Sequence, residues 1–342
     1  MPQRLSWIWF GMIFLVGCSN PAVPKNDGQT RIVCSFFPIY LFTKNVVGDA
    51  PGVTVELLLP AQAGCPHDYD LTPSDVKRLS SADVYVMNGA GLESFGTDQI
   101  KKANPKVVVI DSSTGVKKIE LSQHHDHEHE HAQVNEHDHD HAHEEEHKEH
   151  AHGGHSHSHG HDHHHDGNVN PHFFSSPKGA AAQVKTIAEE LSKVDPKNAS
   201  VFAVNAKAYE EKLQSMDAAW SEASKSFRRI EIVTMHEVFD YVARDCGLKV
   251  VATIYPVAGQ DPSPAEVRQV IDKIRDTKAA AVFTEPQYPA QVAKMIAQEA
   301  GVAVQELDPV ASGPPDAPLD YYQTRMQANI ETLTRLLAGE SK

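Results

Sequence analysis

Short runs of β-branched and apolar residues alternate with longer amphipathic stretches along most of the chain. In the first part of the sequence, the apolar runs cover residues 31–35, 53–58, 84–87 and 106–110. Their nearly continuous apolar character predicts buried parallel strands. Helical patterns lie between them at 39–47 and 73–81, and Thr72 and Pro73 are typical residues for a helix cap and a first helical position. Together these segments predict one α/β lobe.

The same alternation returns in the last third of the chain. Strands are predicted at 231–234, 250–254, 280–283 and 303–306. Helices are predicted at His236–Cys246, 264–276, 289–300 and Tyr321–Leu337. The repeat therefore predicts a second α/β lobe with about four strands.

A long helical region lies between the two alternating halves. One helix is predicted to begin at Ser176-Pro177 and to end near Val194, and a second begins at Asp195-Pro196. The second can continue to about Ser226 without a Gly or a further Pro. A helix of roughly thirty residues would span about 45 Å, which is longer than one lobe needs. The predicted fold is therefore α/β, with two lobes of four-stranded, mainly parallel sheets flanked by helices and joined by one long rigid helix.

These patterns divide the chain into segments. Residues 30–175 form the predicted N-terminal lobe, 176–228 the helical connection and 229–342 the C-terminal lobe. Within the first lobe, residues 122–167 are rich in His and acidic residues and have no apolar periodicity. They are predicted to be a disordered loop.

The first residues have the pattern of a targeting segment. Arg4 precedes an apolar run that is too short to span a bilayer, and residues 1–17 are predicted to be a signal peptide. The run ends in Gly17-Cys18, which looks like a bacterial lipoprotein box. We therefore expect cleavage before Cys18, lipidation of this residue and a flexible tether over 18–29, although an ordinary signal peptide with an incidental cysteine is the alternative.

Composition and charge narrow the function. The chain has 342 residues, 40% of them apolar, which suits a globular protein with real cores. The formal net charge is −15, but residues 122–167 hold twelve acidic residues and one lysine, so the rest of the chain carries only about −4. No basic face is indicated, and nucleic-acid binding is therefore not expected.

Histidine is concentrated in that same segment. Nineteen of the 22 histidines lie between His124 and His165. We interpret the run as an accessory metal collector, since neutral imidazoles and carboxylates bind Zn²⁺ weakly and lose it when they protonate near pH 6.5. A solvated spacer is the alternative. The candidate metal-binding residues of the histidine run include His124, His125, His127, His129, His163, His164 and His165.

Three histidines lie outside the run, and each follows a predicted strand: His67, His172 and His236. Glu285 and Asp308 hold the corresponding places after two later strands. A single such histidine is more often a helix cap, but ligands of open α/β sheets bind beyond the carboxyl ends of the strands. The three together predict a metal site in the cleft between the lobes. Three imidazoles with one carboxylate or water suit tetrahedral zinc, whereas Mn²⁺ prefers more oxygen ligands; copper and nickel would compete.

Several short motifs accompany these residues. They are Leu59-Pro60, Pro66-His67-Asp68-Tyr69, Pro73-Ser74-Asp75, Asn170-Pro171-His172, Thr234-Met235-His236 with Phe239 and Tyr241, Phe283-Thr284-Glu285-Pro286-Gln287 and Leu307-Asp308-Pro309. With them the chain resembles, from about Arg31 to Leu337, the solute-binding lipoproteins of bacterial zinc/manganese ABC importers. The zinc-type members with a histidine-rich loop are the most similar.

The resemblance implies roles for individual residues. His67, His172 and His236 would be the protein ligands, Asp308 or water the fourth ligand, and Glu285 a residue that orients a ligand. Some members use an acid just before the first histidine, but Pro66 occupies that place here. Cys65 stands where the family often has Asp, and it could bind metal or pair with Cys34.

The function that the resemblance implies is capture of Zn²⁺ outside the cytoplasmic membrane and delivery to the membrane permease of an ABC importer. The protein would be a lipid-anchored monomer and not an enzyme. A zinc-dependent hydrolase is one alternative, although the sequence has no HExxH motif. A surface adhesin or a metal-buffering lipoprotein is another, and it rests on the lipid anchor alone.

Overall fold

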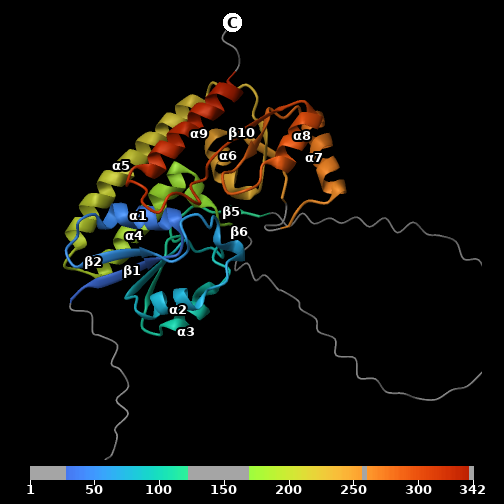
Figure 1. Ribbon diagram of the computed structural model, residues 1–342. Helices are drawn as coiled ribbons and strands as arrows, with labels where there is room; N and C mark the ends of the chain where they lie inside the picture. Colours follow the sequence, from blue (N-terminus) through green and yellow to red (C-terminus); the bar gives the residue numbers. More distant parts are fainter. Residues whose placement is uncertain (1–27, 122–168, 256–259, 339–342) are drawn as a thin grey trace, which may run out of the picture.

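Two four-stranded parallel sheets dominate the computed structural model, which describes residues 28–121, 169–255 and 260–338 (Figure 1). The first sheet has the order β2 (Val53–Leu57), β1 (Thr30–Cys34), β3 (Val84–Met87) and β4 (Val108–Asp111). The second has the order β10 (Ala303–Glu306), β9 (Ala281–Thr284), β7 (Glu231–Thr234) and β8 (Lys249–Thr253). The predicted fold class is thereby confirmed.

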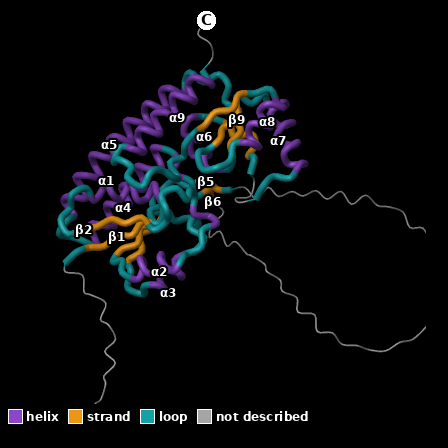
Figure 2. The backbone as a smooth tube through the Cα atoms, viewed as in Figure 1, coloured by secondary structure: helices purple, strands orange, loops and turns teal. Residues whose placement is uncertain are grey.

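Helices flank both sheets (Figure 2). In the first lobe, α2 (Pro73–Ser80) and α3 (Gly96–Ala103) lie on one side of the sheet, and α1 (Phe37–Val47) and α4 (Pro177–Val194) lie on the other. The second lobe carries α6 (Asp240–Cys246), α7 (Pro264–Thr277) and α8 (Gln291–Ala300). Helices α2 and α7 each begin with a reciprocal capping box and a Pro in the first turn, which explains why their starts were predictable.

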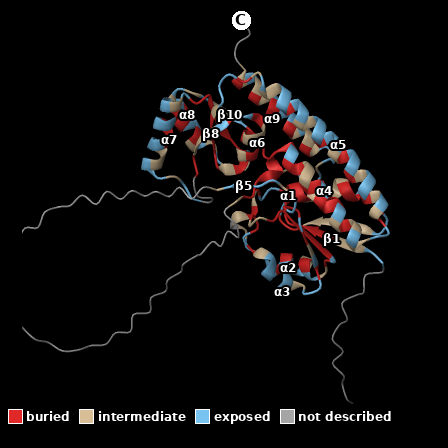
Figure 3. Ribbon diagram, turned by 180° about the vertical axis from the view of Figure 1, so that it is seen from behind, coloured by how far each residue is buried: buried red, intermediate tan, exposed pale blue. Residues whose placement is uncertain are grey.

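One long helix connects the lobes. Helix α5 (Ala199–Ser224) has 26 residues, which corresponds to about 39 Å. It packs against α1 and α4 of the first lobe and against α6 and α9 (Tyr321–Leu337) of the second, and it runs along one edge of the molecule beside α9 (Figure 3). A helix held at both ends in this way resists wide separation of the lobes.

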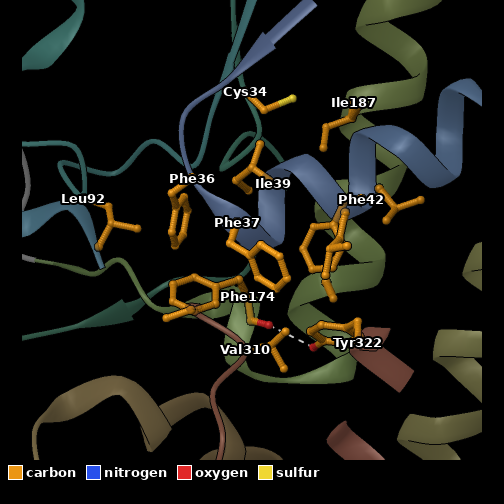
Figure 4. Close-up of a cluster of buried hydrophobic side chains, with 14 of the residues drawn as sticks. Cys34, Phe36, Phe37, Ile39, Phe42, Leu92, Phe174, Ile187, Val310 and Tyr322 are labelled. Carbon is orange, nitrogen blue, oxygen red and sulfur yellow. Dashed lines mark hydrogen bonds between the residues drawn. The ribbon is translucent and has the colours of Figure 1, made fainter. Parts of the chain in front are cut away.

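Apolar packing continues from one lobe into the other. Phe36 and Phe37, just after β1, share a buried cluster with Phe174 and with Val310 and Tyr322 from the last part of the chain (Figure 4). The hydroxyl of Tyr322 donates to the Phe174 carbonyl at 2.9 Å. The junction between the lobes is therefore part of the main core, and a separate, smaller cluster lies within the second lobe.

Two local features differ from the sequence-based expectations. The helix predicted to begin at His236 is instead an extended residue followed by the 3₁₀ turn η3 (Glu237–Phe239) and then α6. The short antiparallel pair β5 (Ile119–Glu120) and β6 (Val169–Asn170) was not predicted. This pair brings together the two ends of the histidine-rich segment, which itself lies outside the described residues, as does the predicted leader with Cys18.

None of the helices in the described ranges is long and apolar enough to cross a membrane.

Candidate metal site

Four potential metal-binding side chains meet between the lobes. They are Cys65, His67, His172 and His236, and one ligand atom from each lies within 4.8 Å of all the others. Cys65 and His67 belong to the loop and the 3₁₀ turn η1 (Pro66–Asp68) after β2, His172 follows β6, and His236 follows β7. The structure therefore brings the three predicted histidines together with Cys65, for which metal binding was one of the two expectations.

His67 and His172 face each other directly. Their Nε2 atoms are 2.8 Å apart, so one Nε2 carries a proton and donates to the other when no cation lies between them. Around a tetrahedral zinc ion with Zn–N bonds of 2.0–2.1 Å, ligand nitrogens lie roughly 3.3 Å apart. A shift of about half an ångström would therefore turn this hydrogen-bonded pair into two metal ligands.

Asn170 orients the His172 ring. Its Oδ1 accepts from Nδ1 of His172 at 2.9 Å and also from the His172 backbone N–H at 2.9 Å. Its Nδ2 donates to the Glu237 carbonyl and to the Asp240 carboxylate, which establishes which side of the amide is the acceptor. The proton of His172 is thus held on Nδ1, and the lone pair of Nε2 points toward the other three side chains.

Glu285 orients the His236 ring in the same way. Its Oε1 lies 2.8 Å from Nδ1 of His236, and its Oε2 accepts from Gln287 at 2.6 Å. Burial disfavours the charged ring, but the charge of Glu285 and this hydrogen bond outweigh it and raise the pKa of His236 above 6.5. His236 is 6% exposed, and its Nε2 is buried without a hydrogen-bond partner. A buried nitrogen in that state is costly unless something binds it.

The structure does not bring Asp308 into this group. Its Oδ2 accepts from Nε of Arg325 at 2.7 Å, and its Oδ1 accepts from the backbone N–H of Val310 at 2.8 Å. Val310 has a φ of 62°, which is an unfavourable conformation for a β-branched residue. Asp308 therefore stabilises the turn after β10, and the prediction that it is the fourth ligand finds no support in this geometry.

The described cysteines are all free thiols, so the disulfide considered between Cys34 and Cys65 does not occur in this structure. Cys34 and Cys246 are buried, and burial raises the pKa of each to about 12. Cys65 is half-buried, and burial and then the charge of Glu285 raise its pKa well above its usual value. Cys65 is the only one of the described cysteines in the metal-binding group.

Two contributors were not singled out from the sequence. Gln287 holds the second oxygen of Glu285, and the ring of Tyr288 packs edge-on against His236 with centroids 5.4 Å apart. Both residues follow Glu285 in the turn after β9, so the available signal was their closeness to that acid.

A two-lobed α/β fold that gathers imidazoles between its lobes is the architecture of metal-binding solute-binding proteins. The chain matches the family model for zinc-uptake complex component A, periplasmic, over residues 32–336, and it belongs to that family. The resemblance inferred from the motifs is therefore confirmed.

Two curated relatives illustrate the match. The zinc-binding lipoprotein AdcA of Streptococcus pneumoniae R6 is 32% identical over 305 residues, covering 88% of this chain and 53% of that protein. The chain thus spans about half the length of the first curated relatives it matches. The high-affinity zinc uptake system protein ZnuA of Bacillus subtilis 168 is 29% identical, with 88% of each chain covered.

Solved structures agree with the fold. The solute-binding protein FpvC of Pseudomonas aeruginosa, solved with Ni²⁺, superposes with a TM-score of 0.70 and 27% identity over 92% of this chain and 99% of its own. A crystal structure of ZnuA gives 0.68 and 26% identity over 90% and 99%. The family and these neighbours are solute-binding proteins and not enzymes, so the hydrolase alternative is set aside.

Proposed function

We propose that this protein captures Zn²⁺ between its lobes and delivers it to the membrane permease of an ABC importer. The observation that carries the proposal is the convergence of His67, His172 and His236 from both lobes, with a buried, unpartnered Nε2 on His236. The family description and the names of the zinc-binding relatives support the same function.

The donor set suits a captured ion. Three neutral imidazoles would bind through Nε2, and two of the rings have Nδ1 held by Asn170 and Glu285. Such outer partners fix the tautomer and raise the basicity of the ligand. Because His172 and His236 are both at least nine-tenths buried, the bound ion would be shielded from bulk water. Shielding favours retention of the metal over hydrolytic chemistry.

Zinc is the metal that we propose, with manganese less suitable. The group has three nitrogen donors, and no carboxylate of the described residues belongs to it. Mn²⁺ favours oxygen ligands, whereas imidazole suits zinc, copper and nickel. The neighbour FpvC has been solved with both Ni²⁺ and Mn²⁺, so the proposal of zinc rests on the donor set of this chain and not on the fold.

Location and partners complete the proposal. We place the mature protein outside the cytoplasmic membrane as a lipid-anchored monomer, with Cys18 as the lipidated residue; the word periplasmic in the family description supports this side of the membrane. The shared core and helix α5 oppose wide hinge opening. Metal release would then require docking on the permease.

The test separates the site from the histidine-rich run. Deleting residues 122–167 leaves Leu121 and Asn168 to join β5 and β6 as a two-residue connection, a length that suits an antiparallel pair. The deleted protein should retain one tight zinc site by competition titration, and His172→Ala in that background should abolish it. His129→Ala in the full chain is the matched control and should leave the tight site intact. If the deletion itself removed the tight site, the chemistry would belong to the run.

A further inference from the structure

We propose that the sulfur of Cys65 is the fourth protein ligand of this site and that it biases the site toward thiophilic ions such as Zn²⁺ and Cd²⁺ over Mn²⁺. The inference rests on the proposed function, because it specifies the ligand set of the same site. It assigns a role to the one residue of the four-membered group that the three-histidine site leaves unused.

The position of Cys65 is set by the same loop that positions His67. Cys65 immediately precedes η1, and Pro66 fixes the first residue of that turn. The backbone N–H of Ser94 donates to the Pro66 carbonyl at 3.4 Å, and its hydroxyl donates to the Tyr69 carbonyl at 2.9 Å. The turn is thereby held from both ends. The thiol and the imidazole are presented as one unit to His172 and His236.

The two acids that follow β9 and β10 are already engaged. Both oxygens of Asp308 are bonded, to Arg325 and to the Val310 N–H. Both oxygens of Glu285 are bonded as well, to His236 and to Gln287. A tetrahedral ion would bind three imidazole nitrogens and need one more donor. Among the described residues, Sγ of Cys65 is the donor within reach of all three, and the buried Nε2 of His236 is unpartnered beside it.

The chemistry balances without a redox step. The divalent ion displaces the thiol proton, which leaves to solvent, and one metal–sulfur bond forms. The thiolate then neutralises one of the two positive charges of the metal ion. The nearby carboxylate of Glu285, bonded to His236, neutralises the other. A carboxylate ligand would supply the same charge through a hard oxygen. The sulfur therefore changes the preference among metals and leaves the net charge of the site unchanged.

Cobalt spectroscopy tests the ligation directly in the full-length chain. The protein carries Cys18→Ser so that the amino-terminal thiol contributes nothing, and it receives half an equivalent of Co²⁺ under reducing conditions so that the tightest site fills first. A thiolate-to-cobalt charge-transfer band in the near ultraviolet is expected, because imidazole and carboxylate ligands in the histidine-rich run give none. Cys65→Ser should lose the band, and Cys246→Ser, the matched buried control, should keep it.

Metal competition tests the selectivity. Loss of a residue that only orients a ligand typically weakens metal binding by 10- to 100-fold. Because Cys65 would be a ligand itself, Cys65→Ser should weaken Cd²⁺ binding by at least about 100-fold. The affinity for Mn²⁺ should change far less. Cys65→Asp should raise the affinity for Mn²⁺ relative to that for Cd²⁺, because it replaces the soft sulfur with a hard oxygen. Circular dichroism confirms that each variant is folded.

The outcomes distinguish this inference from the proposed function. If wild type gives no sulfur band, and Cys65→Ser binds zinc and cadmium as tightly as wild type while His172→Ala does not, Cys65 is no ligand and the three-histidine site stands. If His172→Ala also binds zinc at full strength, the proposed function fails with it.

Discussion

The two lobes contribute to the site in different ways. The N-terminal lobe supplies three of the four side chains, Cys65, His67 and His172, and two of its imidazoles already contact each other at 2.8 Å. The C-terminal lobe supplies only His236, whose ring is bonded to the buried acid Glu285. One half of the site is therefore assembled by its own loops, and the other half is a single ring held in place by a charge.

The difference shows what the junction between the lobes has to do. Asn170 orients His172 and also donates to Glu237 and Asp240 of the second lobe. The Tyr241 hydroxyl donates to the Asn170 carbonyl and accepts from the Ile119 N–H. These bonds tie the N-terminal part of the site to η3 and the start of α6, the segment that follows His236. The site is complete only while this junction is intact.

Two acids at the ends of neighbouring strands also differ in their roles. Glu285 follows β9 and Asp308 follows β10, yet only Glu285 contacts a histidine. Asp308 is instead paired with Arg325 on α9 and caps the turn at Val310. Equivalent positions in the sheet therefore have separate roles, one in the site and one in stability.

Removing Asp308 should have the largest effect, and it should fall on stability. Asp308→Ala leaves the Val310 N–H without its acceptor, which costs about 1 to 3 kcal/mol. It also leaves the half-exposed Arg325 without its partner, which adds up to about 1 kcal/mol. Zinc affinity should be unchanged, because both oxygens are bonded to Arg325 and Val310 and Asp308 is outside the metal-binding group. Urea unfolding of the metal-free protein and zinc competition measure the two effects.

Asp308→Asn is the matched control for that change. The amide oxygen can still accept from Val310, so the loss of stability should be smaller than with alanine. A drop in zinc affinity for either variant as large as that of His172→Ala would return Asp308 to the ligand set.

A buried acid behind the N-terminal ligands should produce a pH dependence of nearly the same size. Glu93 accepts from the backbone N–H groups of Asn88 and Gly89, and the Asn88 side chain donates to the Pro171 carbonyl beside His172. Burial raises the pKa of Glu93 from 4.5 to about 7, against the lowering effect of its hydrogen bonds. The folded state thus holds this proton more tightly than the unfolded state.

The stabilisation linked to Glu93 is therefore fully present below pH 4.5 and is lost as pH rises through about 7, a change of roughly 3 kcal/mol. The free energy of unfolding of the metal-free chain, measured against pH for wild type and Glu93→Gln, gives a difference curve with this slope. Glu331→Gln, on the exposed side of α9, is the surface control. A flat difference curve for Glu93→Gln would contradict the assignment.

The sequence predicted the three histidines that meet between the lobes better than it predicted their neighbours. His67, His172 and His236 could be found because the end of a parallel strand can be recognised from its apolar run, and because the remaining histidines are segregated elsewhere. The fold class followed from the same runs. The prediction of the histidines and that of the fold class both depend on patterns within short stretches of sequence.

The missed features depend on contacts between distant segments. The pairing of Asp308 with Arg325 joins a strand end to a helix 17 residues later, and nothing in the strand pattern indicates it. For Cys65 the sequence left metal binding and pairing with Cys34 both open, because its place depends on the 3₁₀ turn that follows it and three-residue turns have no apolar period. The two-residue strands β5 and β6 are too short to show an alternation.

The smallest expected effect concerns the acid that holds the C-terminal ligand. Glu285→Gln keeps an oxygen that can accept from Nδ1 of His236 but removes the charge beside the metal. Replacing a partner of this kind typically costs 10- to 100-fold in metal affinity, or about 1.4 to 2.8 kcal/mol. Zinc competition at constant pH measures it, and unfolding of the metal-free protein should change less than with Asp308→Ala.

The matching change in the other lobe is Asn170→Asp, which adds a charge next to His172 where the native residue is neutral. If charge is what the C-terminal half requires and geometry is what the N-terminal half requires, Glu285→Gln should weaken zinc binding at full stability. Asn170→Asp should instead disturb the junction, because the carboxylate can no longer donate to the Glu237 carbonyl or to Asp240. Equal losses of affinity and stability in both variants would mean that the two halves of the site are held in the same way.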